Sequence, residues 1–289
     1  MVTQVNDRST LMGCNKVYYL LTKETNLFDL RPLPGKGVGL FARQHIKRGT
    51  RLIAETAIAT CPLDSTDGLY AQIEALSTER RNAYISLALN IDHLDQRIIH
   101  DMMAKIRQSS TDAYAQHVAR NDAVARQIYI TNCTVTGQEG AHATSVFLTH
   151  SRMNHSCQPN ACCHVNTQLD KLTVHATHDI AANEELCYGY IELLRLPEER
   201  AQALSRWGIV CDCAACVGPN AAESKLRRSR GAKIEGAMLS GLLNTVQTRS
   251  LNSCVVQMPK SDRERLELAE ELVQICIAEN LYDPTLAGA

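Results

Sequence analysis

Apolar and polar positions along the chain follow two different spacings, which predict a helical block between two strand-rich regions. In the first region, Gly39–Arg43 and Arg51–Glu55 are short apolar runs separated by a polar turn, as in two consecutive strands. Between 68 and 130, apolar residues recur every three or four positions, which predicts three or four amphipathic helices. Strand-like spacing returns near Val146. The pattern therefore predicts an α+β chain in which a helical insert interrupts the strands.

The second half of the chain continues with strands and ends in helices. Ala161–Val165 and Lys171–Ala176 flank a polar turn and are expected to pair as a hairpin. Pro197 and the acidic residues after it predict a helix that runs to Trp207, because proline and acidic side chains suit a first turn. Beyond residue 217, the apolar period predicts two more helices joined by a loop, over Ile234–Val246 and Arg263–Ile277.

Composition and charge narrow the classes of function. The chain has 289 residues, of which 45% are hydrophobic and 21% charged, as in ordinary globular proteins. With 30 basic and 31 acidic residues, neither direct nucleic-acid binding nor attachment to an anionic membrane is expected. The apolar runs are shorter than the roughly 18–20 residues of a membrane span, and the N-terminus lacks a secretory signal pattern. We therefore expect an intracellular protein.

Three of the twelve cysteines stand close together, in the C-x-C-x-x-C pattern of Cys211, Cys213 and Cys216. Clustered cysteines in a reducing compartment are more often metal ligands than disulfides, and tetrahedral Zn²⁺ takes four nitrogen or sulfur ligands. The pattern predicts a zinc site that takes its fourth ligand from elsewhere. From spacing alone, the candidates for that ligand are nearby histidines and Cys157, Cys162, Cys163 and Cys187.

A polar loop stands between two apolar, strand-like segments. The ten residues Ser151–Asn160 include two asparagines, a histidine, a cysteine and a proline, and Met153 is their one large apolar residue. Asparagine, serine and proline favour turns, so an irregular loop is expected. Because loops held by a rigid framework often carry function, Asn154, His155 and Cys157 are candidate functional residues.

Four motifs occur in one order along the chain: Gly37-Val38-Gly39, the loop Arg152–Asn160, the segment Glu184–Tyr190 and the C-x-C-x-x-C pattern. Together they resemble the SET-domain protein methyltransferases, and the loop sequence NHSCQPN is the most specific of them. The stretch from Tyr190 to Cys213 is more narrowly similar to the SET-and-MYND branch and its fungal relatives that lack the MYND finger. The resemblance covers about residues 27–216.

The resemblance implies a SET fold, in which small β-sheets surround a knot-like crossing of the chain. Within the part that it covers, it implies a SET domain over 27–191 with a helical insert at about 62–130 and a zinc-binding post-SET segment over 192–217. The rest of the chain is then an N-terminal extension over 1–26 and, from its apolar period, a helical C-terminal region over 218–289. It also implies S-adenosylmethionine (SAM) as methyl donor and a protein lysine, which could belong to a histone, as acceptor. A nuclear location, a cytoplasmic one or both would suit such a substrate.

The resemblance also assigns roles to individual residues. Tyr190 matches the catalytic tyrosine, and Cys157 matches the fourth zinc ligand beside Cys211, Cys213 and Cys216. The residues expected at the cofactor are Lys36, Gly37, Val38, Gly39, Asn132, Asn154, His155, Tyr190, Trp207 and Ile209. Independently of the resemblance, we expect from alternation along a strand that Tyr188 and Tyr190 face opposite ways, and that Tyr188 serves packing.

Two features motivate alternatives to this enzyme. Gly189 stands where the family has an aspartate or cysteine before the tyrosine, and aromatic residues make up only 4% of the chain, so few can line a lysine channel. One alternative is a SET-fold binding or scaffold protein with weakened catalysis. The other is a SAM-dependent enzyme that acts on a non-histone protein or a small molecule.

Overall fold

The computed structural model describes residues 26–90, 94–109, 111–136, 143–242 and 261–281. The chain divides into two compact units, each built from more than one segment. The first unit holds the described residues up to Asn154 together with Cys163–Leu186. The second holds His155–Cys162 and the described residues from Cys187 onward. The polar loop therefore begins in the first unit and ends in the second.

The first sheet is built on a hairpin. Strands β1 (Phe28–Leu33) and β2 (Gly37–Ala42) pair antiparallel around a turn in which Gly35 and Gly37 have φ of +76° and +77°. Glycine suits this left-handed backbone region because it has no Cβ to clash. β2 also pairs antiparallel with β10 (Glu185–Tyr188). The strand order is β1-β2-β10-β7, with β7 at Asn154–His155.

Two three-stranded sheets accompany it in the described residues. One has the order β3-β9-β8, with β3 at Arg51–Glu55, β9 at Lys171–Ala176 and β8 at Ala161–Asn166. The other has the order β4-β6-β5, with β4 at Ala59–Pro62, β6 at Ala143–Val146 and β5 at Thr134–Val135. The predicted hairpin of β8 and β9 is confirmed. The consecutive strands β2 and β3, however, belong to different sheets.

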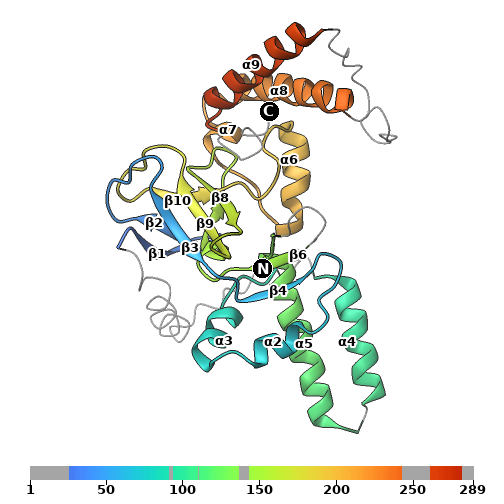
Figure 1. Cartoon of the computed structure of the whole chain (residues 1–289). Helices are drawn as coiled ribbons and strands as arrows, with labels where there is room; N and C mark the ends of the chain where they lie inside the picture. Colours follow the sequence, from blue (N-terminus) through green and yellow to red (C-terminus); the bar gives the residue numbers. More distant parts are fainter. Residues whose placement is uncertain (1–25, 91–93, 110, 137–142, 243–260, 282–289) are drawn as a thin grey trace. The chain divides into compact units, whose positions relative to one another are not determined.

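The predicted helical insert is also confirmed, and its helices lie together in Figure 1. They are α2 (Leu69–Glu74), α3 (Thr78–Ile85), α4 (Gln96–Gln108) and α5 (Ala113–Asn132). Ser77, Asp95 and Asp112 accept backbone N–H groups at the starts of α3, α4 and α5, as N-caps do. The insert shares an apolar core with β4 and β6, which includes Ile58, Cys61, Leu69, Ile73, Tyr84, Ile128, Tyr129 and Val146.

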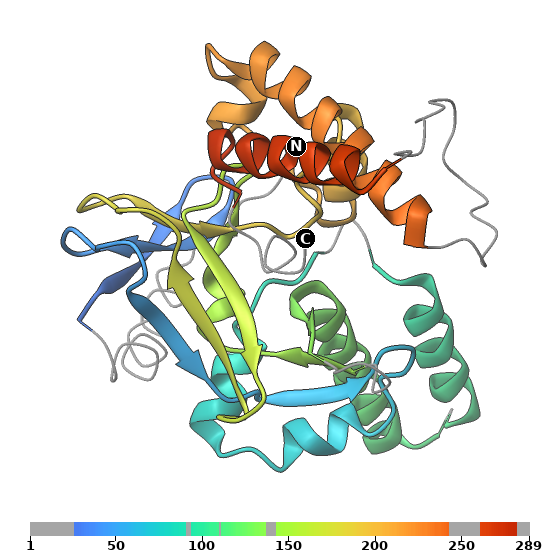
Figure 2. The same ribbon diagram turned by 45° about the horizontal axis from the view of Figure 1, so that its top comes forward.

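The second unit is mainly helical. Its helices are α6 (Pro197–Leu204), which a 3₁₀ turn extends to Trp207, α7 (Ala214–Val217), α8 (Ala221–Leu242) and α9 (Asp262–Ala278). α8 and α9 lie side by side in Figures 1 and 2 and share a small apolar core around Ile234 and Leu272. Within the described residues, no helix combines the length and the apolar character that crossing a bilayer requires.

The helix starts in this unit were only partly predicted. Pro197 does open α6, and the Glu199 carboxylate accepts from Leu196 N at 2.9 Å. The expected start at Ile234 is wrong, because α8 begins at Ala221. Its first turns are rich in Ala, Lys, Arg and Glu, which favour helix without giving an apolar period. The predicted end at Val246 and the loop before Ser261 lie outside the described residues.

Replacing Tyr129 by phenylalanine is expected to lower the free energy of unfolding by about 1–3 kcal/mol. The buried hydroxyl accepts from Cys61 N at 2.9 Å and donates to Thr144 O at 2.5 Å, so its removal strands a buried N–H and a buried carbonyl. Chemical denaturation measures the loss. Tyr114→Phe is the control, because Tyr114 is 76% exposed. Equal losses in the two variants would contradict the account.

Candidate active site and metal centre

The glycine motif and Asn154 meet in the first unit. Asn154 Nδ2 donates to Val38 O at 2.9 Å and to Glu185 Oε1 at 2.7 Å, which fixes the orientation of the amide. A Cβ atom on the buried Gly39 would lie 2.5 Å from Glu185 Oε1, 2.7 Å from Leu33 Cδ1 and 3.0 Å from Asn154 Nδ2, so a side chain there would require these neighbours to move. At Gly37, by contrast, no atom lies within 4 Å of the Cβ position. Within the motif, Gly39 is therefore closely surrounded by side chains, whereas the backbone of Gly37 is accessible.

The carboxylate of half-buried Glu55 anchors the start of the polar loop. Glu55, the last residue of β3, accepts from Thr149 N at 2.9 Å and from His150 N at 3.2 Å. Burial raises the pKa of Glu55, and these backbone hydrogen bonds oppose the rise. The 3₁₀ turn His150–Arg152 follows, and buried Arg152 donates to Ser86 O at 2.9 Å. The turn is therefore held at both ends immediately before Asn154.

His155 connects the loop to Tyr190 within the second unit. The backbone N–H of Tyr190 donates to His155 Nδ1 at 3.0 Å, which assigns the proton of the neutral imidazole to Nε2. His155 Nε2 lies 3.3 Å from Cys157 Sγ and is placed to donate to it. Burial lowers the pKa of His155 to about 4, so the ring is neutral near pH 7. One imidazole thus holds both the backbone of Tyr190 and the sulfur of Cys157.

Aromatic rings gather around Tyr190. Its ring centroid lies 5.4 Å from that of His155, 4.8 Å from that of Tyr188 and 5.4 Å from that of Trp207. The expectation that Tyr188 and Tyr190 face opposite ways is wrong. Along a strand, side chains alternate between the two faces, so residues two apart share a face. β10 itself ends at Tyr188, and the rings of Tyr188 and Tyr190 lie in the same cluster.

Gly189, between these tyrosines, is a close-packed position. A Cβ atom there would lie 2.9 Å from Leu193 Cδ1 and 3.2 Å from Leu193 Cγ. A larger residue at this position would require the Leu193 side chain to move. Glycine at this position lets the Leu193 side chain approach the backbone next to Tyr190.

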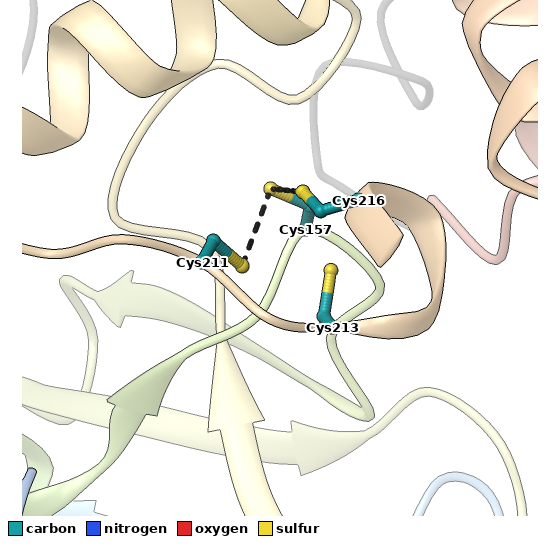
Figure 3. Close-up of side chains that lie close together, drawn as sticks. All are labelled: Cys157, Cys211, Cys213 and Cys216. Carbon is teal, nitrogen blue, oxygen red and sulfur yellow. Dashed lines mark hydrogen bonds between the residues drawn. The ribbon is translucent and has the colours of Figure 1, made fainter. Parts of the chain in front are cut away.

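Four cysteine sulfurs converge in the second unit (Figure 3). The thiols of Cys157, Cys211, Cys213 and Cys216 lie within 4.8 Å of one another. Cys157 Sγ is 3.8 Å from Cys211 Sγ and 3.6 Å from Cys216 Sγ. Hydrogen bonds from the thiols of Cys157 and Cys211 lower the pKa of Cys213, which favours a thiolate. Such a group could hold a metal ion, and Cys157 is the candidate fourth ligand that joins the C-x-C-x-x-C pattern.

The other residues that the resemblance places at the cofactor occupy different settings. Lys36 is exposed in the β1–β2 turn. Asn132 is the last residue of α5, and its side-chain Nδ2 donates to the backbone carbonyls of Ala88 and Ile128, each at 2.8 Å. Its backbone carbonyl accepts from Ser151 Oγ at 3.5 Å. Ile209 is half-buried two residues after Trp207. Asn132 is thus tied to the polar loop, within the first unit.

Two positioning residues do not follow from the sequence reasoning. Glu185 stands inside the motif segment Glu184–Tyr190 without an assigned role, yet it orients Asn154. Glu55 closes an apolar strand and then caps the turn before the loop. Each of them is an acidic residue at one end of a strand, which is a local signal that could have identified them, because a carboxylate that is partly removed from water needs partners.

Comparison with known proteins identifies the family. Residues 37–191, more than half of the chain, match the family model described as "SET domain", and the match includes the glycine motif, the polar loop and Tyr190. The chain belongs to the SET-domain family. In this SET-domain protein, the C-x-C-x-x-C pattern and helices α6 to α9 follow the matched residues.

Named relatives of this SET-domain chain come from fungi and animals. Histone-lysine N-methyltransferase set5 of Schizosaccharomyces pombe is 31% identical over 207 residues, which are 71% of this chain and 54% of that protein. N-lysine methyltransferase SMYD2-A of Danio rerio is 29% identical over 54% of this chain and 37% of its own length. Histone-lysine N-methyltransferase SMYD3 of Mus musculus is 28% identical over 63% and 40%, respectively. The chain thus spans about half or less of the length of these relatives, and the predicted resemblance is confirmed.

Proposed function

We propose that this protein moves a methyl group from SAM to the side-chain amine of a protein lysine. The observation that carries the proposal is the hydrogen bond from the Tyr190 backbone to His155, which joins the residue that we assign as the catalytic tyrosine to the loop with the NHSCQPN sequence. The names of the relatives support the reaction, because set5 and SMYD3 are histone-lysine methyltransferases and SMYD2-A is an N-lysine methyltransferase.

Two features of the first unit support cofactor binding there. No atom lies near the Cβ position of Gly37, so a ligand can approach this backbone closely. The Asn154 amide nitrogen is committed to Val38 and Glu185, which leaves the amide oxygen to accept from a ligand's N–H group. We assign to cofactor binding Lys36, Gly37, Val38, Gly39, Asn132, Asn154, His155, Tyr190, Trp207 and Ile209.

The chemistry asks the protein mainly to align two reactants. Bound SAM supplies a methyl group on a positively charged sulfur, and the acceptor is a neutral amine whose unperturbed pKa is about 10.4. Apolar and aromatic surroundings favour the neutral amine by desolvating its charge. Tyr190 is fixed through its backbone and ring, so its hydroxyl can orient the amine without acting as a base.

We also propose Zn²⁺ at Cys157, Cys211, Cys213 and Cys216. The four-sulfur group supports this assignment, because closed four-thiolate sites are typical of structural zinc. Residues 192–217 then form a post-SET segment, 27–191 the SET domain with its insert and knot-like crossing, and 218–289 a helical C-terminal region. Bound metal would tie the end of the polar loop to the post-SET segment.

The proposed partner is a protein that presents a lysine, and the names of set5 and SMYD3 make a histone the first candidate. A histone substrate implies nuclear residence, and a non-histone substrate would allow a cytoplasmic one. A scaffold protein with weakened catalysis is the alternative. Leu193 packs close to Gly189, which offers a structural reason for glycine there that does not involve catalysis by Tyr190.

Two measurements test the proposed function. Calorimetry is expected to show one SAM site per chain, and labelled SAM is expected to transfer its methyl group to lysine in histones or in proteins of a cell extract. Failure to bind SAM would contradict every enzymatic assignment. Binding without transfer to any protein would favour the scaffold or a small-molecule acceptor.

Gly39→Ala is expected to weaken SAM binding by about 10–100-fold, equivalent to roughly 1–3 kcal/mol, because the new methyl group displaces the hydrogen-bonded Glu185 and Asn154. Calorimetry of SAM binding gives the change. Gly236→Ala in α8 is the control, since nothing lies within 4 Å of its Cβ position and alanine favours helix. Unchanged SAM affinity in Gly39→Ala would remove this motif from the cofactor site.

A further inference from the structure

Arg228 of α8 is a wholly buried cation in the second unit, with a side-chain exposure of 0%. Its Nε donates to Glu279 Oε2 at 2.7 Å and to Ser224 Oγ at 3.1 Å. Nη1 donates to Leu193 O at 2.9 Å, and Nη2 donates to Cys157 O at 2.8 Å. The guanidinium therefore binds one carboxylate and two backbone carbonyls from separate segments of the chain.

Glu279, at the end of α9, keeps this guanidinium in place. Its side chain is also 0% exposed, and it accepts from Ser224 Oγ at 2.5 Å and from Arg227 Nε at 2.6 Å. Burial opposes the charge of Glu279, but these hydrogen bonds outweigh it and lower its pKa. Because a buried charge is costly without a partner, the pair fixes α8 and α9 to each other at this point.

The two carbonyls belong to the segments that carry the candidate chemistry. Cys157 is a ligand of the proposed metal centre, and Leu193 lies three residues after Tyr190. His155 already joins these segments from the other end, through the Tyr190 backbone and Cys157 Sγ. Three residues beyond Arg228, a Cβ atom on Gly231 would lie 2.9 Å from Leu194 Cδ2, so α8 also packs closely against the segment after Tyr190.

We propose that Arg228 is a positioning residue that clamps the Cys157 carbonyl to the Leu193 carbonyl. Through this residue, α8 and α9 help to fix the geometry of the metal centre and of the segment that carries Tyr190. The proposal rests on the proposed function and deepens it, because these helices lie outside the residues that match the SET family model. The planar fork of arginine suits the role, since a lysine ammonium cannot serve three fixed acceptors in the same geometry.

The test compares Arg228→Met, Arg228→Lys and the double variant Arg228→Met with Glu279→Gln, all in the full chain. Arg230→Met is the matched control, because Arg230 forms an exposed ion pair between α8 and α9, with Glu271 at 2.6 Å. The readouts are Zn²⁺ affinity by competition with a chromophoric chelator, the visible spectrum of the Co²⁺-substituted protein, thermal stability, and kcat and KM for SAM.

The clamp predicts a loss of Zn²⁺ affinity of about 10–100-fold in Arg228→Met, with an altered Co²⁺ spectrum, a reduced kcat and no such change in Arg230→Met. The double variant removes the buried charge, so it is expected to regain thermal stability without regaining Zn²⁺ affinity. Arg228→Lys keeps a positive charge beside Glu279, which supports folding. This variant is also expected to lose Zn²⁺ affinity.

Recovery of both stability and Zn²⁺ affinity in the double variant would overturn the clamp, since Arg228 would then serve only folding. Wild-type Zn²⁺ affinity in Arg228→Lys would overturn it too, even if Arg228→Met does not fold. A wild-type protein that binds Zn²⁺ but transfers no methyl group would contradict the proposed function, and the Zn²⁺ and Co²⁺ readouts would still decide the clamp.

Discussion

Tyr190→Phe is expected to lower the rate of methyl transfer by about 10²–10³-fold, as for loss of one preorganised hydrogen-bond donor, while SAM affinity changes by less than about threefold. The contacts that place this residue include its backbone N–H, which donates to His155, and its ring, which packs against Tyr188 and Trp207, and phenylalanine keeps both. Only the hydroxyl, which we assign to orienting the lysine amine, is removed. Single-turnover transfer from labelled SAM measures the rate, and calorimetry measures the binding.

Tyr188→Phe provides a matched control for this experiment. The Tyr188 ring lies in the same aromatic cluster, 4.8 Å from the Tyr190 ring, and its proposed role is packing. We expect its loss of hydroxyl to change the transfer rate by less than about threefold, which is under 1 kcal/mol of barrier. If the two variants lose activity equally, the hydroxyl of Tyr190 has no special role. If Tyr190→Phe retains the full rate, the catalytic assignment is wrong.

Cys213→Ser is expected to abolish stoichiometric zinc binding. It is also expected to lower the free energy of unfolding more than Tyr190→Phe does. Apparent binding free energies of structural zinc are about 10–16 kcal/mol, which is comparable with the roughly 5–15 kcal/mol that stabilise a whole domain. Loss of one of four ligands should therefore release the segment around the C-x-C-x-x-C pattern from the polar loop. Metal analysis of the purified protein gives the stoichiometry, and hydrogen exchange over 205–217 reports the local opening.

Cys163→Ser is the control for the ligand set. Cys163 was a candidate fourth ligand by spacing, but it lies outside the four-sulfur group. This variant should keep one zinc per chain and the exchange protection of the wild type. Full metal content in Cys213→Ser, or its loss in Cys163→Ser, would refute the proposed ligands. A chelator applied to the wild type should reproduce the opening seen in Cys213→Ser.

Local sequence patterns predicted most helices and strands of this fold, but they did not predict which strands pair with each other. The apolar period of the insert and the alternation of β8 and β9 are properties of neighbouring residues, so the sequence displays them directly. Pairing is a long-range choice, and no local pattern indicates that β2 joins β10 while β3 joins β9. The early start of α8 was missed because its first turns are helix-favouring yet polar.

The candidate site shows the same division. The C-x-C-x-x-C pattern predicted three sulfurs of the metal group from spacing, whereas the choice of Cys157 among several candidate fourth ligands came from the family resemblance. Arg228 could not be recognised at all, since an arginine in a basic, helix-favouring run is ordinarily a solvent-facing residue. Its burial depends on Glu279, fifty-one positions along the chain, and on two backbone carbonyls that have no sequence signal.

The pairing of β2 with β10 has a consequence for biosynthesis. The hairpin of β1 and β2 can form as soon as Ala42 has left the ribosome, but the partner strand begins at Glu185. At about 5–20 residues per second, the intervening stretch of about 140 residues takes roughly 7–30 s to translate. During that time the nascent hairpin presents an open strand edge, a surface that readily pairs with other chains. Slow synthesis through the helical insert would prolong this exposure, so the yield of folded protein should depend on the rate of translation between these two strands.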